Sequence, residues 1–241
     1  MNKFQLLFFS GLFFIFTSFK SDNPAYILYT NNGKTVKYSK MLRQLEKADI
    51  ILFGEKHSNP ISHWLQLEIT KDLYEKTEND LILGAEMFEA DNQLIFDEYL
   101  DSMIAQNRFE AEMRLWPNYK TDYKPLVEFA KKNGLDFIAT NIPRRYASVV
   151  NSEGFEGLQQ LSDEAKQYFP PLPIPYDPEL ECYKSLLEMN GMHGHADENF
   201  PKAQAVKDAT MAHFILQNWA PSKLFLHFHG AYHSQDFESI Y

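Results

Sequence analysis

Residues 50–57 read IILFGEKH, and they set the pattern that decides the fold: an apolar run, a glycine, and then charged and imidazole side chains. The same order recurs at residues 81–86, LILGAE. Two further, mainly apolar runs, residues 135–140 and 223–228, also end in polar side chains. Runs this apolar are typical of parallel strands that are buried on both faces. The sequence therefore predicts strands that each deliver polar groups at their carboxyl ends.

Helical segments are predicted between these strands. Asn59 and Pro60 indicate a helix start, because asparagine caps a helix N-terminus and proline suits the first turn. A helix over residues 123–132 should end at Gly134, since glycine is favoured just past a helix end. A long amphipathic helix, residues 201–219, precedes the last strand. This alternation predicts an α/β fold with a mostly parallel sheet and helices on both faces.

The two ends of the chain depart from this alternation. Residues 25–29 and 34–38 flank the sequence NNG at 31–33, which turns easily because asparagine and glycine tolerate positive φ. We expect an N-terminal hairpin there. Residues 229–241 contain no further helix and strand. We therefore expect the chain to be truncated at its C-terminus, with one edge strand missing.

The first residues have the pattern of a signal peptide. Lys3 gives a positive start, residues 4–19 are almost wholly apolar, and a polar stretch follows. A transmembrane anchor is the alternative, but it needs roughly 20 apolar residues. We expect residues 1–21 to be a signal peptide and residues 22–241 to form a single domain. This domain should be exported to the periplasm or envelope, without a stable membrane span.

Composition narrows the classes of partner and site. The chain has 241 residues and a formal net charge of −10, so a nucleic acid backbone would be repelled. Cys182 is the only cysteine, which excludes an internal disulfide and a cysteine-based zinc site. The sequence also lacks the phosphate-binding, dinucleotide-binding, zinc-protease and serine-hydrolase motifs. Any metal chemistry must therefore use histidine, carboxylate or tyrosine.

Polar side chains follow each predicted strand, and in an open parallel sheet the strand carboxyl ends share one edge. These side chains are, in order, Glu55 and His57, then Glu86, then Asn141, Arg144 and Arg145, then His229 and His233. Burying Glu86 is costly unless a cation or metal compensates it, and a salt bridge to Arg144 or Lys56 is the structural alternative. We predict that Glu55, His57, Glu86 and His233 lie in one crevice as catalytic residues or metal ligands.

The remaining histidines have plainer interpretations. His227 lies on the last strand and is expected to be a packed core residue rather than a ligand. His193 and His195 flank Gly194 in an irregular stretch that could cover the crevice, although a solvated connection between helices is the alternative.

Four ordered motifs resemble a known family. They are ILFGEKH at residues 51–57, LGAEMF at 83–88, ATNIPR at 139–144 and GAYH at 230–233. Together they resemble the ChaN-like haem-binding proteins of the Tiki and erythromycin esterase superfamily, over about residues 38–238. Two features depart from that family: no cysteine follows the signal segment, and Lys56 stands where an apolar residue is expected.

The resemblance implies an exported protein of haem or iron uptake, with haem held near the motifs and often between two subunits. A homodimer is therefore a possible assembly. It also implies an ancestry shared with metal-dependent hydrolases, whose glutamates and histidines correspond to Glu55, His57, Glu86 and His233. The residues expected to contact the cofactor are His193, His229, Tyr232, His233 and Arg144. Among them, Tyr232, His193 and His233 are the candidate iron ligands, because tyrosine and histidine both suit haem iron.

Three hypotheses follow from the sequence. The first is a haem- or iron-binding protein of the envelope. The second is a metal-dependent hydrolase in which Glu55 or Glu86 acts as general base on metal-bound water. The third is a structural module whose polar strand ends form salt bridges. Haem requires a wide apolar slot and an axial ligand, whereas a hydrolytic ion requires several ligands within about 2.0–2.3 Å.

Overall fold

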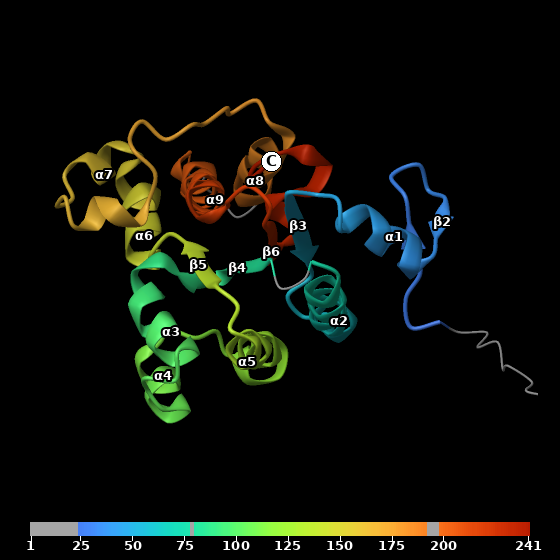
Figure 1. The fold of residues 1–241 in the computed structure, drawn as a ribbon. Helices are drawn as coiled ribbons and strands as arrows, with labels where there is room; N and C mark the ends of the chain where they lie inside the picture. Colours follow the sequence, from blue (N-terminus) through green and yellow to red (C-terminus); the bar gives the residue numbers. More distant parts are fainter. Residues whose placement is uncertain (1–23, 78–79, 192–197) are drawn as a thin grey trace, which may run out of the picture.

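The computed structural model describes residues 24–77, 80–191 and 198–241, and its centre is a four-stranded parallel sheet. The strand order is β3-β6-β4-β5, where β3 is Ile50–Glu55, β6 is Leu224–Gly230, β4 is Leu81–Glu89 and β5 is Phe137–Asn141. Because all these neighbours pair in parallel, their carboxyl ends lie along one edge of the sheet, which we call the rim (Figure 1). The predicted α/β fold with a parallel sheet is confirmed.

Strand β4 continues beyond the predicted run. Met87 and Phe88 are apolar and buried, so the strand extends to Glu89, with an irregular register against β5 after Ala85. Glu86 therefore lies inside the strand and not, as predicted, in the segment that follows it.

One face of the sheet is covered by helices from the middle of the chain (Figure 1). They are α2 (Pro60–Lys76), α3 (Gln93–Leu100), α4 (Gln106–Glu112) and α5 (Lys124–Asn133). The core beneath them is rich in aromatic rings, and Phe88 contacts both Phe96 and Phe137. Burying such rings removes a large apolar area from water, which is the main favourable contribution to folding.

The opposite face is covered by later helices. They are α6 (Arg144–Glu153), α8 (Glu181–Gly191) and α9 (Asn199–Asn218), with the short helix α7 (Glu156–Gln159) beside α6. Met211 and Ile215 of α9 pack on Ile82 of β4 and Phe225 of β6. Short helical turns complete the chain: η1 (Ala90–Asn92), η2 (Tyr119–Tyr123), η3 (Ala165–Tyr168), η4 (Ala231–His233) and η5 (Gln235–Phe237). Helices thus cover both faces, as predicted.

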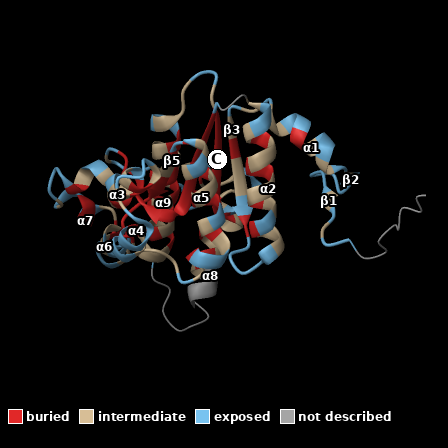
Figure 2. Ribbon diagram, turned by 60° about the horizontal axis from the view of Figure 1, so that its bottom comes forward, coloured by how far each residue is buried: buried red, intermediate tan, exposed pale blue. Residues whose placement is uncertain are grey.

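The N-terminal hairpin is confirmed, with shorter strands than expected. Strand β1 (Leu28–Tyr29) pairs antiparallel with β2 (Thr35–Val36), and Gly33 has the positive φ of 73° that the turn requires. Helix α1 (Tyr38–Leu45) links the hairpin to the sheet and contacts α2. Figure 2 shows a largely exposed hairpin beside a sheet with a buried interior.

Both predicted helix boundaries are also confirmed. Asn59 caps α2 by accepting a hydrogen bond from the backbone N–H of Ile61 at 2.9 Å, and Gly134 ends α5 with φ 64°. None of the helices in the described ranges is both long and apolar enough to span a bilayer. The expected signal peptide lies outside the described residues, as do His193 and His195.

Candidate functional site

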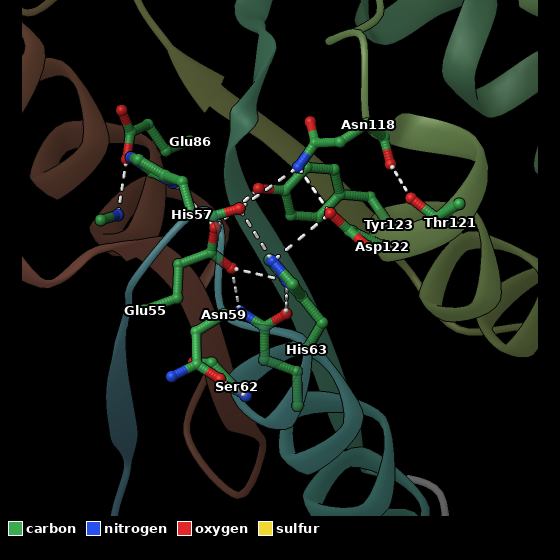
Figure 3. A network of polar contacts seen from close by, with 12 residues as sticks. Glu55, His57, Asn59, Ser62, His63, Glu86, Asn118, Thr121, Asp122 and Tyr123 are labelled. Carbon is green, nitrogen blue, oxygen red and sulfur yellow. Dashed lines mark hydrogen bonds and ion pairs between the residues drawn. The ribbon is translucent and has the colours of Figure 1, made fainter.

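Glu55 is the last residue of β3, and its buried carboxylate is fully engaged. Oε1 accepts hydrogen bonds from the Tyr123 hydroxyl at 2.6 Å and from Nδ1 of His57 at 2.8 Å. Oε2 accepts from the side-chain amide of Gln66, and Nδ1 of His63 lies 3.4 Å away. Figure 3 shows His57, His63 and Tyr123 around Glu55. With both oxygens occupied, Glu55 is placed to orient His57 rather than to bind a ligand itself.

His57 extends from Glu55 toward Glu86 (Figure 3). A Cβ added to Gly230 would lie 2.7 Å from Nε2 of His57 and 3.6 Å from Oε2 of Glu86, so only glycine leaves room for this approach. The His57 side chain is 44% exposed, and its ring contacts Trp116 edge-on at a centroid distance of 5.0 Å. The hydrogen bond with Glu55 raises the pKa of His57. Within the described part of the chain, its Nε2 has no hydrogen-bond partner.

Side chains from two other segments hold the backbone of this loop. The carbonyl of His57 accepts hydrogen bonds from Nε2 of His63 at 3.0 Å and from the amide of Asn118 at 3.4 Å. Asn118 also donates to Asp122 at 2.7 Å. The loop after β3 is therefore fixed by α2 and by the segment that contains η2, so the direction of the His57 ring is set by several elements.

Glu86 and His233 form a second, buried arrangement. Oε2 of Glu86 accepts the backbone N–H of Gly230 at 2.7 Å, and Oε1 lies 3.3 Å from Nε2 of His233. Nδ1 of His233 donates to Asp208 at 2.5 Å, and the Tyr183 hydroxyl donates to the other oxygen of Asp208 at 2.9 Å. One imidazole thus bridges two buried carboxylates. Sequence reasoning did not identify Asp208, which comes from α9.

Burial and hydrogen bonding shift the pKa values of all three groups, and burial raises that of Asp208. Burial acts to lower the pKa of His233, but hydrogen bonds to Asp208 and Glu86 raise it to about 10. Burial acts to raise the pKa of Glu86, but the hydrogen bond with His233 and the positive charge of that ring lower it to about 2. His233 is therefore positively charged at neutral pH, and both of its ring nitrogens are occupied.

His227 and His229 form a separate buried chain on β6. Their Nδ1 atoms lie 3.0 Å apart, while Thr140 contacts Nε2 of His227 at 2.6 Å and Ser234 contacts Nε2 of His229 at 2.7 Å. Burial lowers the pKa of His229 to about 4 and lowers the pKa of His227 well below its ordinary value, so both rings are neutral. His227 is a packed core residue, as predicted. His229, expected to contact the cofactor, is equally buried.

The other expected cofactor residues differ in how accessible they are. The Tyr232 hydroxyl donates to the backbone carbonyl of Cys182, and burial raises the pKa of this tyrosine. Arg144 stands exposed at the rim. The structural alternative required a salt bridge between Glu86 and Arg144 or Lys56. Instead, Nε of Arg144 contacts Glu89 at 2.5 Å. The longer strand β4 explains this, because Glu89 is the residue that reaches the rim beside α6.

The structure brings together the four residues predicted to share one crevice. His233 contacts Glu86, the side chains of His57 and Glu86 both approach Gly230, and Glu55 accepts a hydrogen bond from His57. Asn141 at the end of β5 donates to the backbone carbonyl of Glu86 at 3.0 Å. Its Oδ1 is buried and has no partner in the described part of the chain, so it can accept from a bound water or ligand group.

A metal role for these residues is a separate matter. Across residues 24–77, 80–191 and 198–241, no three histidine, cysteine, aspartate or glutamate side chains are arranged to hold one ion. The roles predicted for Glu55, His57, Glu86 and His233 as metal ligands or catalytic residues stay predictions.

A large cavity lies away from this site. It encloses about 700 Å³ along the outer edge of β5, between α3 and the end of α9. The side-chain amide of Gln93 covers the strand there, donating to the carbonyl of Phe137 at 3.0 Å and accepting from the N–H of Ala139 at 2.6 Å. The histidine and glutamate side chains with shifted pKa values lie at the rim instead, and such groups are the better guide to function.

Comparison with known proteins adds the family. Residues 41–241 match the family described as haem-binding uptake, Tiki superfamily, ChaN. The chloroplastic protein RETICULATA-RELATED 5 of Arabidopsis thaliana is 27% identical over 198 residues, which is 77% of this chain and 26% of that protein. The chain thus spans about a quarter of that relative.

A solved structure shares the fold. ChaN of Campylobacter jejuni, described for its cofacial haem binding, superposes with a TM-score of 0.67 at 21% sequence identity. The superposition covers 89% of this chain and 83% of that protein. That likeness concerns the fold; the match of residues 41–241 shows that the chain belongs to the family described as haem-binding uptake, Tiki superfamily, ChaN.

Proposed function

We propose that this protein binds haem at the rim, beside His57, and serves in haem or iron uptake. The match of residues 41–241 to a haem-binding family is the observation that carries this proposal. The rim supplies the groups such a ligand needs: a half-exposed imidazole, the Trp116 ring against it, and exposed arginines nearby. Bound haem would supply an iron centre, and the residues of this chain would hold and orient it.

His57 is the residue that best fits the role of iron ligand. Histidines that bind metals usually donate their other ring nitrogen to a carboxylate, which fixes the tautomer and the ring direction. Glu55 accepts this bond from Nδ1 of His57, and Nε2, beside Gly230, has no hydrogen-bond partner in the described part of the chain. The candidates from sequence fit less well: Tyr232 and His233 would each have to give up a hydrogen bond.

An absorption titration of the purified chain with haem tests the proposal. We expect a Soret band that saturates at one haem or fewer per chain, and a His57→Ala variant should lose or shift it. His213→Ala is the matched control, because it removes a half-buried imidazole from α9. A wild-type chain that produces no Soret band would refute haem binding. An unchanged band in His57→Ala would refute only the choice of ligand.

The cellular setting is part of the proposal. We infer export to the periplasm or envelope with cleavage of residues 1–21, and binding of haem between two copies of the chain. Fractionation of the producing cells tests the first point, since recovery of only an uncleaved, membrane-bound chain would contradict it. Size-exclusion chromatography with and without haem tests the second, because a chain that remains monomeric at saturation does not form a haem-bridged dimer.

A metal-dependent hydrolase is the second candidate. The Glu55–His57 pair favours it, because a carboxylate that orients an imidazole creates a general base. Glu55 and Glu86, however, already accept hydrogen bonds on both oxygens, so binding an ion would require them to release partners. Metal analysis of the purified protein, followed by ester hydrolysis assays with added divalent ions, separates this candidate from haem binding.

A further inference from the structure

Three arginines gather at the rim around two acidic side chains, and we call Arg114, Arg144 and Arg145 the arginine cluster. Nε of Arg144 contacts one oxygen of Glu89 at 2.5 Å, and Nε of Arg114 contacts the other at 2.8 Å. Arg145 contacts one oxygen of Asp91 at 2.5 Å, and Arg114 contacts the other. The two carboxylates thus hold three guanidinium groups in fixed positions.

The cluster has more positive charge and more hydrogen-bond donors than it uses. Three arginines face two carboxylates, which leaves one positive charge in excess in a chain whose formal net charge is −10. A guanidinium has five N–H donors, and Arg144 uses only Nε within the described part of the chain. Its side chain is 64% exposed, so its two Nη groups face solvent. Their fork geometry matches a carboxylate.

The neighbouring side chains keep the cluster in place. Arg145 lies over the Tyr146 ring at 4.3 Å and donates to its hydroxyl at 3.1 Å. Arg144 and Arg145 open α6, where the N-terminal end of a helix adds partial positive charge. A ligand carboxylate would therefore meet donors that are already ordered, which reduces the entropy cost of binding.

The cluster also lies close to the candidate iron ligand. Arg114 is two residues before Trp116, so their Cα atoms are at most about 7 Å apart. Trp116 contacts His57. The imidazole thus contacts an aromatic ring that is two residues along the chain from an arginine of the cluster. This order suits a flat ligand that is apolar at its centre and carries carboxylates on one side.

We infer that the arginine cluster binds the paired carboxylates of the ligand, which are the propionates if the ligand is haem. Arg144 makes the principal contact, with Arg145 beside it, while Glu89 and Asp91 hold both in position. This inference rests on the proposed function and adds that the propionate edge of the haem faces α6. The alternative is that the cluster only clamps β4, η1 and α6 together.

The test compares haem with its dimethyl ester, in which both carboxylates are blocked, for wild type and for Arg144→Gln. Wild type should bind haem about tenfold or more tightly than the ester, as expected for a charge-assisted pair at an exposed site. Arg144→Gln should lose most of this preference while its affinity for the ester stays unchanged. Arg144→Lys, which keeps the charge but not the fork, should retain part of the preference.

Arg43→Gln is the matched control, because it removes the same charge from exposed α1, away from the rim. It should keep the wild-type preference. An Arg144→Gln variant with the wild-type preference, or a wild type that binds both ligands equally, would overturn the inference and leave haem binding intact. Failure of wild type to bind either ligand would overturn haem binding itself and this inference with it. Thermal unfolding of each variant shows whether a loss of the preference for haem is caused by a loss of folded protein.

Discussion

Residues 54–57 at the end of β3 and residues 230–233 at the end of β6, which we call the two loops, have the same spacing: a glycine followed by a histidine three positions later. They also lie side by side, since Glu55 pairs with Gly230 in the sheet. Their histidines nevertheless have opposite environments. The His57 side chain is 44% exposed and uses one ring nitrogen, whereas the His233 side chain is 7% exposed and uses both.

The difference comes from what packs against each loop. Helix α9 places Asp208 against His233, and β4 places Glu86 on its other side, so this ring is locked between carboxylates. Nδ1 of His57 bonds to Glu55, and the ring contacts Trp116 on its other side. One spacing therefore serves two purposes: His233 holds buried charges together, and His57 is free to meet a ligand. The predictions below compare these two histidines.

The largest difference should appear in the free energy of unfolding. His233→Ala leaves Glu86 and Asp208 buried without a cation, and breaking such a buried pair costs about 3–5 kcal/mol. His57→Ala should cost no more than about 1 kcal/mol, because the ring is half exposed. Urea denaturation of both haem-free variants measures the contrast. Equal losses would show that the two loops have the same structural importance.

A smaller effect is expected from titrating His233, because the neutral ring still fills its site. The pKa of His233 is raised to about 10 in the folded chain, above the ordinary value of about 6.5. Its contribution to stability is therefore complete below pH 6.5 and is lost as the pH rises toward 10. Unfolding free energies measured from pH 6 to 10 should fall for wild type. His233→Gln should show a flatter profile over the same range, and a parallel decline would contradict the assignment.

Much of this comparison could be predicted from sequence, and the rest depends on packing. The apolar runs and the polar residues after them were sufficient to predict a parallel sheet with Glu55, His57, Glu86 and His233 at one rim. The role of each histidine was not predictable, because Asp208 reaches His233 only through the way α9 packs on the sheet. A buried aspartate among the apolar residues of that helix was the available signal.

The end of β4 was misjudged for a different reason. The predicted strand stopped at Ala85, although Met87 and Phe88 continue its apolar character. The structural alternative for Glu86 was then a salt bridge with Arg144 or Lys56, whereas Arg144 contacts Glu89 and Glu86 contacts His233. Because side chains alternate along a strand, an error in its length changes which carboxylate reaches the rim.

The two glycines should respond differently to an added methyl group. A Cβ on Gly54 would lie 2.8 Å from the Ala231 backbone, which cannot move freely, so Gly54→Ala should cost about 1–3 kcal/mol. A Cβ on Gly230 would meet the His57 ring instead, which can turn toward solvent. Gly230→Ala should therefore be the milder change in denaturation, yet it should weaken haem binding by displacing His57. The reverse order of stabilities would contradict the packing of these loops.

The smallest effect, and the most specific to His57, is the pH dependence of haem binding. A proton and an iron compete for Nε2, so binding should weaken as the pH falls below the pKa of His57, by up to about tenfold per pH unit. Glu55 raises this pKa, so loss of haem should begin at a higher pH than for an ordinary histidine.

The variant Glu55→Gln tests this expectation. Its imidazole keeps an acceptor for Nδ1 but loses the neighbouring negative charge. The acid limb of the binding curve, where haem is lost as the pH falls, should therefore move to lower pH. Titrating the dimethyl ester of haem removes the ionisation of the propionates from the measurement, and arginines stay charged throughout. Identical acid limbs in wild type and Glu55→Gln would mean that the Glu55–His57 pair does not hold the iron. A limb that moves as expected would support a ligand-binding role for the loop at the end of β3, with His57, and a structural role for the loop at the end of β6, with His233.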